Sequence, residues 1–86
     1  PLAVIDWGLD FTVLSWNPAA EAVFGWSTTE ALGRNGLFIV PEPDRAEVLS
    51  AWSDLLAQRG GYRHYNKNLT KDGRIIDCEW YNTVLT

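Results

Sequence analysis

The chain has 86 residues, of which 47% are hydrophobic and 21% charged, and five are tryptophans. This length supports one compact core and not two, so we expect a single domain over residues 1–86. The net charge is −4 and the basic residues are scattered, which excludes a nucleic-acid-binding stripe. The lone cysteine forms no intramolecular disulfide, and no apolar run approaches the ~20 residues of a membrane helix, so we expect a cytoplasmic segment without a membrane span.

The first third of the chain predicts two strands and a helix. Residues 3–5 and 11–16 are rich in β-branched and large apolar side chains and flank a turn, which is typical of paired strands. Asn17 followed by proline is typical of a helix start, because the Asn side chain accepts an orphan backbone N–H. We therefore expect a helix over residues 19–24 that Gly25 closes.

Two further helix starts carry the spacing of a capping box, in which the side chains of the first and fourth residues bond each other's backbone N–H groups. Ser27 and Glu30 predict a very short helix that ends at Gly33. Asp44 and Glu47 predict the start of the longest helix.

The long helix and a hairpin occupy the second half of the chain. Apolar residues recur at helical spacing at Val48, Leu49, Trp52, Leu55 and Leu56, and the helix should stop near residues 60–61. Residues 62–70 and 74–85 predict two antiparallel strands, joined by a turn in which Asp72-Gly73 supplies positive φ angles. The order of elements indicates an α+β fold with the helices over one face of an antiparallel sheet.

Two blocks of sequence resemble the PAS fold: WNPAAEAVFGWSTTEALG at residues 16–33 and NLTKDGRIIDCEW at residues 68–80. The matching positions in the first block are Asn17, Glu21, Phe24, Gly25, Glu30 and Gly33. The resemblance implies a five-stranded antiparallel sheet that encloses, with its helices, a small-molecule pocket or a packed core. It also implies a central fifth strand beyond Leu85, so we expect that strand to be absent here, through truncation or completion by a partner, and the chain to be a fragment of a larger signalling protein.

Residues 31–38 and 41–46 are similar to the flavin-binding, light-sensing (LOV) branch of that family. The branch requires a cysteine after Gly-Arg-Asn to attack the flavin, and a basic residue next for the flavin phosphate. Gly36 and Leu37 occupy these two positions. Covalent flavin photochemistry is therefore not expected, and noncovalent flavin binding stays open.

Alternation along the hairpin sorts its side chains into two faces. If the charged residues Arg63, Lys67, Asp77 and Glu79 face solvent, the inward rows are Tyr62, His64, Asn66 and Asn68 on one strand and Ile76, Cys78, Trp80 and Asn82 on the other. Buried amides and an imidazole need hydrogen-bond partners, so the first row implies a polar ligand, trapped water or mutual pairing. A one-residue slip would instead bring Tyr65 and Leu69 inward. Both registers remain open at this point.

The candidate pocket residues are Asn68, Asn66, His64, Cys78, Trp80, Trp52 and Phe38. Asn68 leads because the flavin-binding relatives use an Asn at the matching position to bond the ligand. Haem is not expected, because haem-binding members place the axial His on or near the long helix, where this chain has Trp52. His64 has no neighbouring acids or thiols, so a metal site is not expected either. The cofactor is therefore left unknown. Cys78 is interpreted as a small buried hydrophobe and Trp52 as core packing or pocket wall.

No G-x-S-x-G turn, serine–histidine pairing or glycine-rich phosphate loop occurs, so we do not expect the domain itself to be an enzyme. We expect a sensory domain of a multidomain signal-transduction protein, such as a histidine kinase or a diguanylate cyclase. It would bind a small ligand or transmit a signal to that attached output domain. The alternative is a ligand-free dimerisation or interaction module, and we expect a homodimer.

Overall fold

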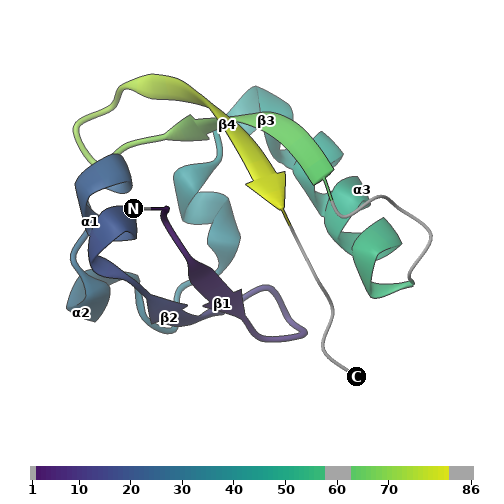
Figure 1. Cartoon of the computed structure of the whole chain (residues 1–86). Coiled ribbons are helices and arrows are strands. Elements are labelled where there is room, and N and C mark those ends of the chain that lie inside the picture. The colour runs from purple at the N-terminus through teal and green to yellow at the C-terminus, as the bar shows by residue number, and fades with distance from the viewer. Residues whose placement is uncertain (1, 58–62, 82–86) are drawn as a thin grey trace.

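The computed structural model describes residues 2–57 and 63–81 (Figure 1). The elements in chain order are β1 (Ile5–Trp7), β2 (Val13–Trp16), α1 (Pro18–Phe24), α2 (Thr28–Ala31), the 3₁₀ turns η1 (Gly36–Ile39) and η2 (Glu42–Asp44), α3 (Arg45–Leu56), β3 (Arg63–Leu69) and β4 (Ile75–Tyr81). The predicted order of strands and helices, and the α+β class, are confirmed. None of the described helices has the length and apolar character needed to cross a membrane.

The four described strands form two separate antiparallel pairs. β1 pairs with β2, with Ile5 opposite Trp16 and a bulge at Asp6 and Trp7. β3 pairs with β4 without a bulge along its whole length. Figure 1 shows the β3–β4 pair on the opposite side of the molecule from the β1–β2 pair, with the helices between and beside them. The position expected for a fifth strand, after Leu85, lies outside the described residues.

The register of β3 turns the predicted polar row towards the interior. Asn68 is 1% exposed, whereas Tyr65 on the other face of the strand is 63% exposed. His64 and Asn66 lie half-buried on the same face as Asn68. The predicted inward row is therefore confirmed for these residues, and the slipped register that would have buried Tyr65 is wrong. The other two polar members of the predicted rows, Tyr62 and Asn82, lie outside the described residues.

Two of the predicted helix starts are present as expected. The Oδ1 atom of Asn17 accepts the backbone N–H of Ala20 at 2.9 Å, and Gly25 ends α1 with a φ of +82°. Ser27 and Glu30 form the reciprocal capping box of α2. The short α2 ends at Ala31, two residues before the predicted end.

The third predicted cap, at Asp44, is wrong. Its side chain makes no capping hydrogen bond, and its backbone has φ −98° and ψ −2°. A capping side chain reaches the next turn from an extended backbone, and here η2 runs directly into α3, so Asp44 is already helical. The hairpin turn also differs in detail, because Gly73 has a φ of +86° while Asp72 has no positive φ.

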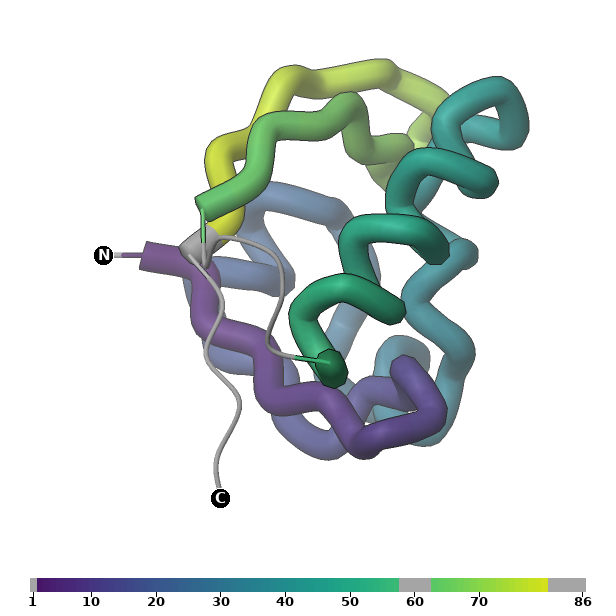
Figure 2. Tube along the Cα trace, turned by 90° about the vertical axis from the view of Figure 1, so that its right-hand side faces the viewer, coloured from purple at the N-terminus to yellow at the C-terminus, as the bar shows by residue number. Residues whose placement is uncertain are grey.

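The core lies between the β1–β2 pair and the first helices. Its buried residues are Val13, Trp16, Ala20, Phe24, Ala31 and Ile39. By contrast, no residue of α3 is buried, although apolar residues recur along it. Figure 2 shows α3 crossing the molecule between the two strand pairs. Because this helix is not packed into the core, the space beside it is the first place to look for a site.

Candidate functional site

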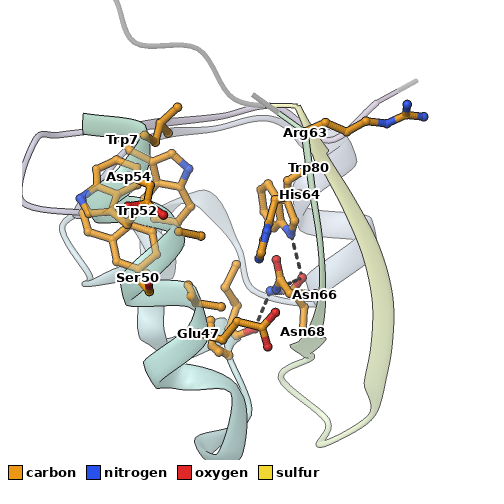
Figure 3. Close-up of a pocket in the computed structure, with 17 residues that line it drawn as sticks. Trp7, Glu47, Ser50, Trp52, Asp54, Arg63, His64, Asn66, Asn68 and Trp80 are labelled. Carbon is orange, nitrogen blue, oxygen red and sulfur yellow. Dashed lines mark hydrogen bonds between the residues drawn. The ribbon is translucent and has the colours of Figure 1, made fainter. Parts of the chain in front are cut away.

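A cavity of about 410 Å³ separates α3 from the inner face of β3 (Figure 3). Its volume lies within the range of roughly 300–1,000 Å³ that is typical of small-molecule sites. The side chains that matter for its chemistry are Trp7 and Phe11 from the β1–β2 hairpin, Glu47, Ser50, Trp52 and Asp54 from α3, and His64, Asn66, Asn68 and Trp80 from β3 and β4.

Three aromatic rings form one wall of the cavity. The ring centroid of Phe11 lies 4.7 Å from that of Trp52 and 4.8 Å from that of Trp7. The Nε1 atom of Trp52 donates to the backbone oxygen of Leu9 at 3.3 Å. These contacts join α3 to the β1–β2 hairpin, so Trp52 is both a packing residue and a pocket wall.

Gly36 lies where this aromatic wall meets η1. Its backbone N–H donates to the oxygen of Phe11 at 2.8 Å, and Phe11 itself has a φ of +65°. A Cβ atom at Gly36 would lie 2.5 Å from Cζ of Phe11 and 2.8 Å from Cζ3 of Trp7, closer than carbon atoms can approach. Aromatic rings therefore fill the space that a side chain at this position would need.

Asn68 is held by hydrogen bonds within the protein. Its Nδ2 donates to the backbone oxygen of Ile39 at 2.8 Å. Its Oδ1 accepts from Nε1 of Trp80 at 3.0 Å and from Nδ2 of Asn66 at 3.2 Å, which occupies both lone pairs. Asn68 lines the cavity as predicted, but its oxygen is already satisfied, so this residue joins β3, β4 and η1.

Two other residues of this inward row, His64 and Asn66, each have a polar atom without a hydrogen-bond partner among the described residues. Nε2 of His64 is buried and has no hydrogen-bond partner among the described residues. Nδ2 of Asn66 donates to the oxygen of Lys67 at 2.9 Å and to Asn68, which leaves its Oδ1 as an acceptor without a partner in residues 2–57 and 63–81. A buried polar atom without a partner costs about 1–3 kcal/mol, so the Nε2 atom of His64 favours water or a ligand in the cavity, and Oδ1 of Asn66 adds an acceptor to the lining.

The charges around the cavity are unequal. Glu47 extends from α3 towards the strand side, and Asp54 contributes a second carboxylate to the lining (Figure 3). Arg63 points away from the cavity in the same view, and its Nε lies 2.6 Å from Oε2 of Glu79. No other lysine or arginine among the described residues lines the cavity.

The structure brings together five of the seven predicted pocket residues: Asn68, Asn66, His64, Trp80 and Trp52. Phe38 does not line this cavity, because it packs on the far side of the core with its ring centroid 5.6 Å from those of Trp16 and Trp26. Cys78 packs against the core instead. Burial raises the pKa of its thiol, as does the charge of Asp77, which favours the unreactive thiol form.

Sequence reasoning missed Trp7, Phe11 and Glu47. One signal was available for Glu47, because residues 47, 50 and 54 are spaced to form a polar stripe beside the apolar stripe at 48, 52 and 55. Nothing local marks Trp7 and Phe11, since their contact with Trp52 joins segments about 40 residues apart in the chain.

Comparison with known proteins agrees with this architecture. The family model described as the PAS fold matches residues 1–85. The structure of the PAS domain of a protein from Colwellia psychrerythraea superimposes with a TM-score of 0.82 at 23% identity, over 90% of this chain and 65% of that one. Sensor protein FixL of Bradyrhizobium diazoefficiens is 52% identical over 31 residues, which are 36% of this chain and 6% of FixL. The chain belongs to the PAS family, as its sequence motifs predict and the family match over residues 1–85 shows.

Proposed function

We propose that this PAS domain senses a small molecule in the cavity between α3 and β3 and passes the bound state to an output domain of its parent protein. The expected output is a histidine kinase or a diguanylate cyclase, and the expected location is the cytoplasm. The short match to a sensor protein supports a signalling role. The observation that carries the ligand proposal is the buried Nε2 of His64, which has no partner in the described part of the chain and lines a cavity of about 410 Å³.

The wall of the cavity provides a route from ligand to output. Asn68 links β3 to η1 through Ile39 and to β4 through Trp80. Because α3 has no buried residue, it is joined to the β1–β2 hairpin mainly by the ring contact and hydrogen bond of Trp52, so a ligand in the cavity can influence its position. A ligand that touches both α3 and β3 would favour one relative position of the two elements, which is a shift between pre-existing conformations.

A cavity-filling substitution tests the proposal in the parent protein. Ala51 lines the cavity, so Ala51→Phe should abolish ligand binding and leave the output locked in one state. Ala46 is exposed on the same helix and does not line the cavity, so Ala46→Phe is the matched control. Unchanged ligand response in folded Ala51→Phe would contradict the proposal.

The second candidate is a dimerisation module. It is favoured by exposed apolar side chains on and before the β1–β2 pair, where Leu2 is 82%, Val4 53% and Leu14 61% exposed. If this surface forms a homodimer, Leu14→Glu should yield a monomer in analytical ultracentrifugation, whereas the control Leu32→Glu, at an exposed leucine after α2, should leave the dimer intact. A wild-type chain that stays monomeric at millimolar concentration would exclude this role.

A further inference from the structure

The wall of the cavity uses its hydrogen-bond donors within the protein. The amide group of Asn66 donates to the backbone oxygen of Lys67 and to Oδ1 of Asn68. The amide group of Asn68 donates to the backbone oxygen of Ile39. The indole N–H groups of Trp80 and Trp52 donate to Asn68 and to the backbone oxygen of Leu9. The amide and indole N–H groups of the wall are thus largely used within the protein, and the Ser50 hydroxyl, which also lines the cavity, is a donor that a ligand can still reach.

Acceptors, by contrast, remain available. The Oδ1 of Asn66 has no donor among the described residues, and the Glu47 carboxylate, which also lines the cavity, accepts no hydrogen bond from them either. The buried Nε2 of His64 also has no partner among the described residues, and it accepts or donates according to the tautomer. The two oxygen acceptors, on Asn66 and Glu47, are complementary to a ligand that donates N–H groups.

Charge and aromatic surface favour the same ligand. Glu47 brings a negative charge to the opening, and Arg63, which could offset it, points away and pairs with Glu79. The rings of Phe11 and Trp52 present aromatic faces, which attract cations as well as other rings.

We propose that the cavity selects a cationic aromatic ligand, an arylalkyl ammonium, over neutral and anionic compounds with the same ring. The ring lies against the wall of Trp7, Phe11 and Trp52, and the ammonium group donates towards Asn66 and Glu47. This inference rests on the proposed function, because it assigns a ligand class to the same cavity.

Three probes that share one ring and differ in charge test the selection. Isothermal titration of the whole chain at pH 7 compares tryptamine, which is cationic, with 3-methylindole, which is neutral, and indole-3-acetate, which is anionic. Tryptamine should bind most tightly and indole-3-acetate most weakly, with about tenfold between these two extremes from the combined ion-pair and cation–π contributions.

A charge-neutral substitution separates Glu47 from the ring contacts. Glu47→Gln should weaken tryptamine binding about two- to fivefold, the range of a partly exposed ion pair, and leave 3-methylindole binding unchanged. Glu42→Gln is the control, because Glu42 is an exposed carboxylate that does not line the cavity, and it should change neither affinity.

The outcomes distinguish this inference from the proposed function. Equal affinity for the three probes, tighter binding of indole-3-acetate, or no binding of tryptamine would overturn the selection of cations. Ligand binding that Ala51→Phe blocks without any preference for positive charge would overturn the inference and leave the proposed function standing. Tryptamine affinity that is unchanged in folded Ala51→Phe would overturn the assignment of this ligand to the cavity.

Discussion

The indole Nε1 of Trp80 on β4 donates a hydrogen bond of 3.0 Å to Oδ1 of Asn68 on β3. Asn68 is 1% exposed and also donates to the backbone oxygen of Ile39. The residue that the family resemblance marks as a ligand contact is thus satisfied by its own protein. Asn68 still shapes the cavity, because its side-chain oxygen positions Trp80 and Asn66, which both line it.

Replacing Asn68 should destabilise the fold. Asn68→Leu leaves the Trp80 indole N–H and the Ile39 oxygen without their partner, so we expect the free energy of unfolding to fall by about 2–4 kcal/mol, measured by urea denaturation. Asn66→Leu, which removes one bond to Asn68 from a half-buried position, is the control and should have a smaller effect. If Asn68→Leu lowers the free energy of unfolding by less than about 0.5 kcal/mol, the hydrogen bonds of Asn68 to Trp80 and Ile39 do not stabilise the fold as described, because two buried partners without a bond should cost more.

A side chain at Gly36 should be poorly tolerated. Gly36→Ala places a methyl group against the rings of Phe11 and Trp7, and overpacking of this kind costs about 1–3 kcal/mol. Thermal or urea unfolding measures the loss. In the double variant with Phe11→Leu, part of the loss should be recovered because the smaller side chain frees space. If the double variant instead loses the sum of the two single-variant losses, the Phe11 ring does not limit position 36.

The two capping-box sequences should respond differently to the same substitution. Ser27→Ala removes a side chain that accepts the Glu30 backbone N–H at 3.1 Å, and should lower the free energy of unfolding by about 1 kcal/mol. Asp44→Ala removes no capping bond and should change it by less than about 0.5 kcal/mol. Equal losses in the two variants, measured under the same conditions, would argue against the difference between these helix starts.

Glu30 should contribute to the pH dependence of stability. The hydrogen bond from Lys71, at 2.6 Å, and then that from the Ser27 backbone lower the pKa of Glu30 from 4.5 to about 2. Because the folded-state pKa is depressed, this contribution is present above pH 4.5 and is lost as the pH falls towards 2.

Unfolding experiments between pH 6 and pH 2.5 test this linkage. The stability difference between wild type and Glu30→Gln should shrink as the pH falls through that interval, and Lys71→Gln should reduce the acid sensitivity in the same direction. A difference that stays constant with pH would show that Glu30 titrates alike in the folded and unfolded chains.

The members of the inward polar row could be predicted from sequence because strand side chains alternate with period two. Alternation places His64, Asn66 and Asn68 on one face and the charged Lys67 on the other, where it forms an ion pair of 2.8 Å with Asp77. The sequence leaves the slipped register open, and the burial of Asn68 decides between the two. The capping box at Ser27 could be predicted as well, since it depends on residues three positions apart.

The aromatic wall and the role of Asn68 could not be predicted in this way. Trp7, Phe11 and Trp52 meet only after β1 and α3 fold together, and Phe11 needs a positive φ that its residue type does not suggest. The spacing at Asp44 and Glu47 predicts a cap, but the preceding η2 turn gives Asp44 a helical backbone, so no cap forms there.

The most direct test of ligand binding in this cavity is a ¹H–¹⁵N NMR titration of the ¹⁵N-labelled chain with a library of small aromatic compounds. The tryptophan indole N–H signals report separate places, because Trp52 and Trp80 line the cavity whereas Trp26 packs against Phe38 away from it. Compounds that bind should shift the signals of Trp52 and Trp80 and leave that of Trp26 in place. Binding that shifts Trp26 alone, or a library in which no compound shifts Trp52 or Trp80, would contradict the assignment of the cavity as the sensory site.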